Sequence, residues 1–390
     1  MKQNVTGRFF TGRFFTGRFF TGRFFIGHFF TGRFFTGCLF MVFSCLALPA
    51  LADITIEKIG PDLDHPWGMA ALSEDEMLVT TRPGYLVKIA ANTGNYNIIS
   101  NPPKVAHWGQ GGLLDVAIKG KDIFLCYAKP TATGATTAID KARLNHATLQ
   151  GRMTIFTAHP SSSAPQHFGC RLEIKDDRIY ASLGDRGNRA EAQNPASHNG
   201  SIIRLHLDGT IPKDNPKYDG WAEEIYSIGH RNPQGLATHP ITGHLFSHEH
   251  GPQGGDEINM IQKGENYGWP LVSFGKEYGT DTPVSDLTTH PDMIDPVWVW
   301  TPSIAPSGMA YYPKDAAMFE ELQGHLLVGS LKFKQLIAVR LDDKGIPTSQ
   351  RIILDGTLGR IRDVAIASDG AILILNDAPK PWGGLYRLSQ

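Results

Sequence analysis

The sequence contains few cysteines and almost no net charge. Only four of its 390 residues are cysteines, and the formal net charge is −1. A small disulfide-stabilised scaffold is therefore excluded, and the chain is long enough to bury a core without such bridges. No acidic residue precedes Asp53, whereas Lys2 and several arginines do, so the rest of the chain is mildly acidic. This charge argues against nucleic acid or an anionic membrane as the main partner.

The first 52 residues lack the pattern of a folded core. A five-residue unit, TGRFF, recurs from Thr6 and is followed by the apolar run CLFMVFSCLALPALA. This run has about 15 residues, whereas a helix needs about 20 to span a bilayer. It ends in Ala50-Leu51-Ala52, the small-residue spacing that signal peptidase requires. We predict that residues 1–52 are a signal peptide and that residues 53–390 form one periplasmic catalytic domain without stable membrane insertion; a membrane anchor is the alternative.

Export would leave only Cys126 and Cys170 in an oxidising compartment. Both lie in apolar segments with the pattern of strands, which favours buried free thiols slightly over a disulfide. Spacing along the sequence does not decide between the two, so both alternatives remain open.

Beyond residue 53 the sequence shows no long amphipathic helical period. Short β-branched and apolar runs alternate with turns rich in Gly, Pro, Asn and Asp, which is typical of an all-β protein. Six units of roughly 50 residues repeat a pattern of three recognisable strands. These strands lie within 69–89, 114–156, 171–207, 235–261, 309–341 and 364–388.

This repeat predicts a six-bladed β-propeller of four-stranded antiparallel blades. We expect a strand at 54–59 to close the ring against the last blade. The insertions at 128–150 and 267–303 are expected to be loops on the functional face. A two-sheet β-sandwich is the alternative fold.

Several short motifs are too specific for generic turns between strands. GHRNPQG begins at Gly229, EHGPQGGDEIN at Glu249 and NYGWP at Asn266. Further motifs are GQGGLLD, HFGCRL, GDRG, DGTIPKDNP, SLK and GRIRDV. Together these motifs resemble the soluble quinoprotein glucose and aldose sugar dehydrogenases over nearly all of residues 60–390.

The resemblance implies an enzyme that oxidises an aldose sugar at its anomeric carbon to a lactone. It implies hydride transfer to pyrroloquinoline quinone, onward transfer of electrons to an external quinone or cytochrome, and a monomer or weak dimer. The insertions that build the glucose pocket of the glucose-specific members are not visible, and His250 stands where those enzymes have a glutamine. The shorter aldose sugar dehydrogenases, with their broad substrate range, therefore fit better.

The resemblance also assigns catalytic roles. It implies that His167 is the general base, and imidazole suits this task because its unperturbed pKa lies near neutrality. Asp185 of GDRG is the matching carboxylate that would hold the histidine tautomer. Arg231 and Asn232 would stabilise the negative charge that develops on the quinone oxygens.

A cofactor with three carboxylates requires a basic binding site. Lys332, Arg360 and Arg362 match the cofactor-binding cations of the family, and Gln110 matches its sugar- or cofactor-contacting glutamine. Arg360 and Arg362 alternate along an extended segment, so both side chains can point to one face.

Calcium is implied by the same resemblance. The backbone carbonyls of Gly251 and Pro252 would complete a coordination shell beside the cofactor, and calcium tolerates such irregular oxygen ligands. A second, structural calcium is implied at Asp256, Glu257 and Tyr267.

Three other interpretations remain. His248 and His250 have a spacing that puts both on one face of a strand and could bind a transition metal. A calcium-dependent propeller lactonase or other hydrolase would also combine an axial metal with a catalytic histidine. A cofactor-free extracellular binding propeller is the third possibility, and retention of His167, Arg231 and the basic residues argues against it.

We predict that the exported protein begins at Asp53, because cleavage is expected after the small residue Ala52. N-terminal sequencing of periplasmic protein checks this cleavage site. Exported protein that still carries TGRFF repeats would contradict it.

Overall fold

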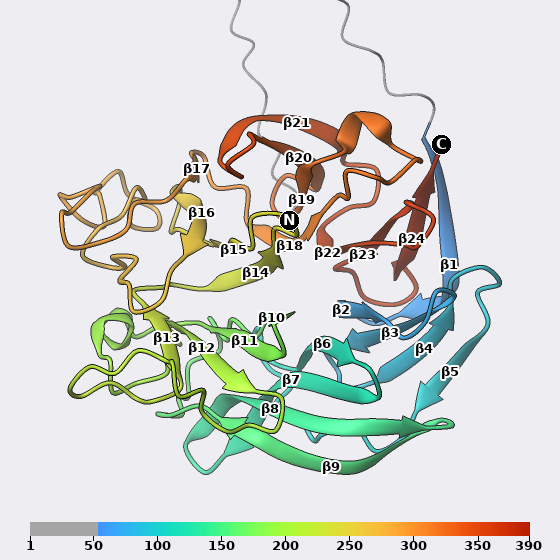
Figure 1. Ribbon diagram of the computed structural model, residues 1–390, viewed down its shortest axis with the longest axis horizontal. Helices are drawn as coiled ribbons and strands as arrows, with labels where there is room; N and C mark the ends of the chain where they lie inside the picture. The colour runs from blue at the N-terminus through green and yellow to red at the C-terminus, as the bar shows by residue number, and fades with distance from the viewer. Residues whose placement is uncertain (1–53) are drawn as a thin grey trace, which may run out of the picture. The chain divides into compact units, whose positions relative to one another are not determined.

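The computed structural model describes residues 54–390, and these residues form six four-stranded sheets arranged around one axis (Figure 1). All strand pairs within the sheets are antiparallel. The innermost strand of each sheet packs against the innermost strands of the two neighbouring sheets, so six strands surround the axis. These strands are β2, β6, β10, β14, β18 and β22. The predicted six-bladed β-propeller is confirmed, and the β-sandwich alternative is wrong.

The four strands of each blade succeed one another from the axis outward. Blade 1 contains β2 (Pro66–Ala71), β3 (Glu76–Thr81), β4 (Leu86–Ala90) and β5 (Tyr96–Ile99); blade 2 contains β6 (Leu113–Lys119), β7 (Asp122–Thr131), β8 (Gly134–Asn145) and β9 (Thr148–Thr157). Blade 3 contains β10 (Leu172–Lys175), β11 (Arg178–Leu183), β12 (Ser201–His206) and β13 (Ile225–Ile228); blade 4 contains β14 (Pro233–Thr238), β15 (Leu245–Glu249), β16 (Asp256–Ile261) and β17 (Trp298–Trp300). Blade 5 contains β18 (Pro306–Tyr311), β19 (His325–Ser330), β20 (Gln335–Leu341) and β21 (Pro347–Asp355); blade 6 contains β22 (Ile361–Ile366), β23 (Ile372–Asn376), β24 (Gly383–Ser389) and β1 (Thr55–Leu63).

The ring closes as the sequence predicts. The N-terminal strand β1 pairs with the C-terminal strand β24, with Ile56 opposite Leu388. Two short 3-10 helices, η1 (Arg189–Gln193) and η2 (Glu320–Leu322), lie between strands. No helix among residues 54–390 is long and apolar enough to cross a membrane.

The apolar pattern follows from packing between blades. Strands in the middle of a blade are covered on both faces by the neighbouring blades, and β23 is accordingly buried at every position. Such strands appear in the sequence as continuous apolar runs. The outer strand β5 is exposed at three of its four positions, which is what an edge strand allows.

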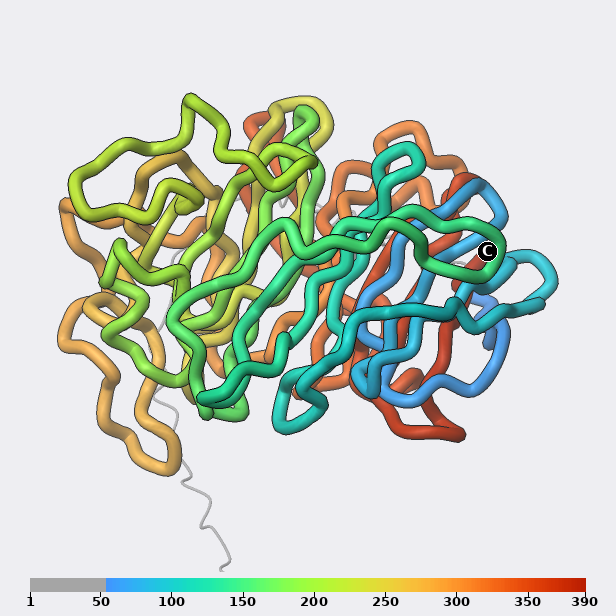
Figure 2. The backbone as a smooth tube through the Cα atoms, turned by 90° about the horizontal axis from the view of Figure 1, so that it is seen from below, coloured from blue at the N-terminus to red at the C-terminus, as the bar shows by residue number. Residues whose placement is uncertain are grey.

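One expected loop is instead regular sheet. Residues 128–150 belong to β7, β8 and β9, which extend as long antiparallel strands with Thr131 opposite Gly134 at one turn (Figure 2). The prediction was wrong because β8 is buried mainly through small alanines and threonines, which do not produce a strong apolar signal. The segment 267–303 is irregular as predicted, apart from β17 near its end.

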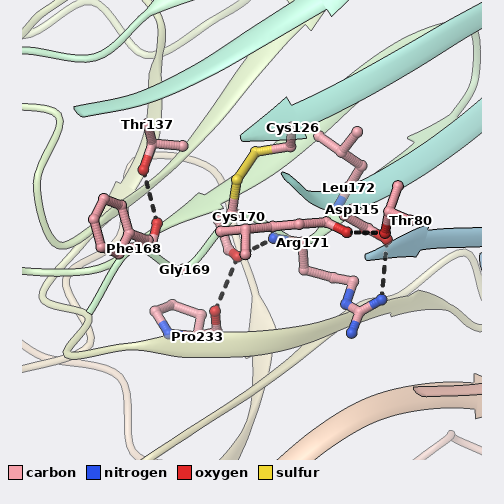
Figure 3. Close-up of a disulfide and its surroundings, with 12 residues drawn as sticks. Thr80, Asp115, Cys126, Thr137, Phe168, Gly169, Cys170, Arg171, Leu172 and Pro233 are labelled. Carbon is pink, nitrogen blue, oxygen red and sulfur yellow. Dashed lines mark hydrogen bonds and ion pairs between the residues drawn. A yellow bond between two sulfur atoms is a disulfide. The ribbon is translucent and has the colours of Figure 1, made fainter. Parts of the chain in front are cut away.

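The structure also corrects the expectation of free thiols. Cys126 in β7 and Cys170 before β10 form a disulfide, with their Cα atoms 5.7 Å apart (Figure 3). It joins blade 2 to blade 3 within an apolar cluster that includes Phe124 and Phe168. This pairing could not be read from the chain, because the two blades approach each other only in the folded ring.

We predict that Cys126→Ala lowers the stability of the protein by about 2–4 kcal/mol, because the disulfide closes a long loop of the unfolded chain. Chemical denaturation under oxidising and reducing conditions measures this loss. The double variant Cys126→Ala/Cys170→Ala is the control, and dithiothreitol should not destabilise it further. A parent protein whose unfolding curve is unchanged by dithiothreitol would contradict the prediction.

Candidate active site

All six blades contribute to a cavity of about 180 Å³ at the axis, which we call the central cavity. Its lining comes from the innermost strands, from the segments that precede them and from the segments that follow the second strand of a blade. The lining includes polar, charged and aromatic side chains: Trp67, Arg82, Gln110, Phe168, Asn232, His250, Arg360, Arg362 and Asp377.

Three guanidinium groups line the central cavity around one carboxylate. Arg362 and Arg360 contact Asp377 Oδ2 at 3.0 and 3.2 Å, and Arg82 lies beside them. Burial alone would raise the pKa of Asp377, but Arg362, His65 and Arg360 hold it well below its usual value. Burial lowers the pKa of Arg362. The lining therefore carries more positive than negative charge, which favours a polyanionic ligand.

The basic residues expected from the sequence are only partly brought together. Arg360 and Arg362 line the central cavity, as do Gln110 and Asn232. Lys332 is exposed, and its Nζ lies 5.3 Å from the centre of the Phe333 ring rather than in the cavity lining.

Sequence reasoning missed Arg82 and Asp377, which also line the central cavity. Arg82 precedes Pro-Gly and Asp377 follows Asn, so both read as ordinary turn residues. The sequence carried no signal that would have distinguished them.

A second cavity of about 320 Å³, the outer chamber, contains the predicted catalytic residues. It is lined by Gln166, His167, Asp185, Gly187, Arg189, Arg231, Trp269 and Tyr278. His167, Asp185 and Arg231 come from separate motifs of blades 3 and 4 and meet here.

The His167 ring is held by a buried carboxylate. Its Nδ1 lies 2.6 Å from Asp185 Oδ1. Asp185 also accepts hydrogen bonds from Trp269 Nε1 at 2.9 Å and from the backbone N–H of Gly187 at 2.7 Å. An ionised Asp185 keeps the proton of His167 on Nδ1, which leaves Nε2 free to accept a proton.

The electrostatics of the chamber favour this protonation state. Burial lowers the pKa of His167, and Arg231 lowers it further against the opposing effect of Asp185. Burial would raise the pKa of Asp185, but its bonds to His167, Gly187 and Trp269 bring it below its usual value. At neutral pH His167 is therefore a neutral base beside a charged carboxylate.

The backbone around His167 is unusual. His167, Gly169 and Cys170 have φ values of +58°, +62° and +78°, a left-handed region that costs energy for residues other than glycine. The segment is held by a bond from the His167 N–H to Gln110 Oε1 at 2.8 Å and by the Cys126–Cys170 disulfide. The disulfide thus fixes the segment that carries the base.

Glycine is required where GDRG approaches this segment. A Cβ atom on Gly184 would lie 2.3 Å from the carbonyl oxygen of His167. The absence of a side chain lets the next residue, Asp185, come within hydrogen-bonding distance of the imidazole.

Arg231 is a buried cation without a counterion in the described part of the chain. It is 6% exposed, and no salt bridge to a carboxylate involves it among residues 54–390. Its guanidinium donates to the His250 carbonyl at 2.9 Å and to Tyr278 Oη at 3.3 Å, and it lies over the Trp269 ring. A desolvated, unpaired cation is suited to stabilising charge that develops on a ligand.

Glu249, which sequence reasoning did not single out, positions Arg231 and Asn232. This buried carboxylate accepts hydrogen bonds from the backbone N–H groups of both residues, and it pairs with His230 Nδ1 at 2.9 Å. Asn232 Oδ1 in turn accepts the Gly169 N–H at 3.2 Å. Glu249 was visible as the first residue of the EHGPQGGDEIN motif, but its partner could not be inferred.

Two of the residues expected to bind calcium, Pro252 and Asp256, accept hydrogen bonds from backbone N–H groups. The Pro252 carbonyl accepts the Lys276 N–H at 3.0 Å. Asp256 accepts the N–H groups of Gly251 and Ala305 at 2.8 and 2.7 Å, and burial raises its pKa to about 6. Asp256 therefore fastens the backbone of this segment.

The other two residues predicted to bind calcium, Glu257 and Tyr267, lie beside Glu249. Glu257 and Tyr267 line a small cavity together with Glu249 and Gly251. The Tyr267 hydroxyl donates to the Met260 carbonyl and accepts the Gln262 N–H. Burial and the neighbouring Glu249 raise the pKa of Glu257 well above its usual value. The buried carboxylate of Glu249 and the half-buried carboxylate of Glu257 are oxygen ligands of the kind that calcium accepts.

The transition-metal alternative gains no support. His248 is fully buried and both its ring nitrogens lack a partner, while His250 Nε2 is bonded to the Pro306 carbonyl. Burial lowers the pKa of His248 to about 3. Among residues 54–390, no three histidine, cysteine or acidic side chains converge as a metal-binding group.

The chain is similar in sequence and structure to known proteins. The sequence is 38% identical over 342 residues to the aldose sugar dehydrogenase YliI of Escherichia coli, covering 84% of this chain and 91% of that protein. The crystal structure of the soluble aldose sugar dehydrogenase from Escherichia coli in the apo-form superimposes with a TM-score of 0.81 at 36% identity, covering 86% of this chain and 99% of that one.

A structure of the PQQ-bound form of the aldose sugar dehydrogenase from Streptomyces coelicolor superimposes with a TM-score of 0.72 at 26% identity, covering 87% of this chain and 98% of that one. The profile of the glucose / sorbosone dehydrogenase family matches residues 63–387, which is nearly all of the propeller. The chain therefore belongs to the glucose / sorbosone dehydrogenase family of oxidoreductases.

Proposed function

We propose that this protein is an exported, calcium-dependent quinoprotein that oxidises aldose sugars at the anomeric carbon to lactones in the periplasm. The observation that carries the proposal is the His167–Asp185 pair, which lies with the unpaired cation Arg231 in a chamber beside a cationic cavity. The relative with bound pyrroloquinoline quinone supports the choice of cofactor. Electrons would pass on to an external quinone or cytochrome, and the enzyme would act as a monomer or weak dimer.

The positive charge of the central cavity supports a cofactor with three carboxylates. Arg82, Arg360 and Arg362 would bind carboxylate oxygens, with Gln110 and Asn232 as polar partners. Lys332 would contribute from outside the cavity. When bound, pyrroloquinoline quinone supplies the oxidant that takes up the anomeric hydrogen together with two electrons.

The residues of the outer chamber would handle the proton and the charge. His167 Nε2 accepts the proton of the anomeric hydroxyl as the carbonyl group of the lactone forms. Asp185 stabilises the imidazolium that results, and Trp269 holds Asp185 through its indole N–H. Arg231, which lines the chamber, would stabilise negative charge that develops on the ligand.

Calcium would be held by the backbone carbonyls of Gly251 and Pro252 beside the cofactor, where it would act as a Lewis acid. A second ion would lie at Asp256, Glu257 and the backbone of Tyr267. Glu249, which lines the same small cavity as Glu257 and Tyr267, would be a further oxygen ligand.

The buried ion pairs at the axis make hydrolysis a poorer interpretation. A propeller lactonase would place several carboxylates on an axial metal, but here Asp115 and Asp363 contact Arg171 at 3.1 and 2.9 Å. A cofactor-free binding propeller would not need the unpaired Arg231 or the arginines around Asp377.

We predict that His167→Ala lowers turnover about 100- to 10,000-fold, as expected for loss of a positioned base, while affinity for the quinone is nearly unchanged. Titration with quinone, followed by single-turnover reduction by an aldose, separates the two effects. Because the pKa of His167 is lowered, the parent should stay active below pH 6.5 and lose activity only as the pH falls through that lowered value. His206→Ala, in β12 and in neither cavity, is the control. Reduction at the parent rate by His167→Ala would overturn the mechanism.

We predict that calcium raises the melting temperature of the cofactor-free parent and that Glu257→Gln abolishes most of this shift. An ion that binds only the folded state stabilises it by about 2.7 kcal/mol at 100 times its dissociation constant. Thermal unfolding with calcium or with a chelator measures the effect. Asp286→Asn, an exposed change in the loop between β16 and β17, should respond like the parent. An unchanged melting curve for the parent would remove the calcium assignment.

A further inference from the structure

Four loops that line the central cavity also carry exposed aromatic side chains. These loops are residues 82–85, 100–112, 331–334 and 377–382, which lie between strands of blades 1, 2, 5 and 6. Each supplies one residue to the cavity lining: Arg82, Gln110, Leu331 and Asp377. Each also carries one exposed aromatic residue: Tyr85, Trp108, Phe333 and Trp382. We call these four aromatic residues the rim.

The four loops are connected to one another around the cavity. Arg360 Nη1 donates to a carbonyl of the 331–334 loop at 3.3 Å, and Arg360 Nη2 lies 3.2 Å from Asp377 Oδ2. His65 also contacts Asp377, at 2.9 Å, and its carbonyl accepts the Arg82 N–H at 3.0 Å. The Arg82 guanidinium donates in turn to the Gly109 carbonyl. The rim therefore belongs to one continuous surface.

Exposed aromatic groups gather on this surface. Both exposed tryptophans and the single exposed phenylalanine of residues 54–390 belong to the rim, and Trp382 is 68% exposed. Large apolar groups that gather in contact with water mark an interaction site, and Trp and Tyr are frequent anchors in protein interfaces. None of the four lines the outer chamber, which is built by blades 3 and 4. The rim is therefore distinct from the place proposed for the sugar.

The charge around the rim is positive. Asp377 is the only acidic residue in the sequence of the four loops, and its side chain is 7% exposed and paired with arginines. Lys332 and Lys334 flank Phe333, and Lys380 lies two residues before Trp382. All three lysines are exposed, and none pairs with a carboxylate of residues 54–390. Exposed, unpaired cations attract a partner whose surface is acidic.

The proposed reaction requires such a partner. Oxidation of one aldose to its lactone yields two electrons and two protons, and the electrons must leave the enzyme before the next turnover. A protein is far too large to enter a cavity of about 180 Å³. A protein acceptor must therefore bind the loops around the central cavity, where the rim lies.

We propose that the rim is the docking surface for the electron acceptor, and that this acceptor is a small, soluble, one-electron redox protein with an acidic surface. This inference rests on the proposed function. Each encounter transfers one electron, so two acceptor molecules are reduced for each aldose and both protons pass to solvent. The lysines accelerate the encounter, and the aromatic side chains supply apolar contact in the small interface that is typical of short-lived redox complexes.

A binding experiment with two probes of opposite charge tests the surface. Plastocyanin is an acidic one-electron copper protein, and horse cytochrome c is a basic one-electron haem protein of similar size. Calorimetric titration of the calcium-loaded, quinone-free protein measures binding without catalysis. We expect plastocyanin to bind at least about 10-fold more tightly than cytochrome c at low ionic strength and to lose affinity as salt is added. No binding of plastocyanin, or equal affinity for the two probes, would overturn the proposal.

Substitutions place the binding site. Trp382→Ala should weaken plastocyanin binding about 10-fold at every salt concentration, because it removes an apolar anchor. The double variant Lys334→Gln/Lys380→Gln should weaken it about 3- to 10-fold at low ionic strength and little at high ionic strength. Lys344→Gln, between β20 and β21 at the opposite end of blade 5, and Tyr218→Ala, between β12 and β13, are the matched controls. Equal losses in these controls would overturn the proposal.

A small dye separates this inference from the proposed function. With glucose and dichlorophenolindophenol, the holoenzymes of all these variants should turn over at the parent rate, since none of the changed residues lines the central cavity or the outer chamber. Trp382→Ala and the lysine double variant should reduce plastocyanin more slowly. Plastocyanin binding that depends on the rim, in a parent that oxidises no aldose, would support the docking surface and count against the proposed function.

Two results would overturn the docking surface alone. One is aldose oxidation by the parent with plastocyanin binding that is unchanged in Trp382→Ala and in the lysine double variant. The other is binding of the parent to vesicles of phosphatidylglycerol, lost in Trp382→Ala, without binding to plastocyanin. That result would assign the rim to a membrane surface, because exposed tryptophans and lysines also suit a lipid interface.

Discussion

The packing of the blades around the axis depends on one buried arginine, Arg171. Arg171, from the start of blade 3, lies between Asp115 of blade 2 and Asp363 of blade 6, and its guanidinium stacks 4.5 Å from the ring of Trp67 in blade 1. Burial raises the pKa of Asp115 to about 7 against the opposing effect of Arg171, so the carboxylates depend on this cation to remain charged. Removing one partner of such a group would leave an uncompensated buried charge. The network therefore fixes how four blades meet beneath the central cavity.

Buried carboxylates also hold the predicted catalytic residues in place. Asp185 orients His167, and Glu249 holds the backbone of Arg231 and Asn232, so each catalytic loop is fastened by a buried carboxylate from another segment. The disulfide adds a covalent constraint beside the left-handed turn that carries His167. Preorganisation of this type lets donors and charges act without rearrangement during the reaction.

The two cavities differ in the charge of the side chains that line them. The central cavity has three arginines for one aspartate, whereas the outer chamber contains a neutral histidine, an ionised aspartate and one unpaired arginine. The net positive charge of the central cavity therefore favours a polyanionic ligand there, and Arg231 is the buried cation of the chamber.

The sequence by itself predicted the propeller, because apolar strands separated by turns recur about every 50 residues, which is the length of a four-stranded blade. It also contained the motifs with His167, Asp185, Arg231, Arg360 and Arg362, since these residues lie in short, ordered segments. Tertiary structure alone decided the Cys126–Cys170 pairing, the course of β8, the exposure of Lys332 and the recruitment of Arg82 and Asp377. The disulfide depends on the packing of blade 2 against blade 3, and Arg82 and Asp377 come to one cavity from blades 1 and 6, which β1 joins by pairing with β24. The course of β8 is set within blade 2 by its pairing with β7 and β9.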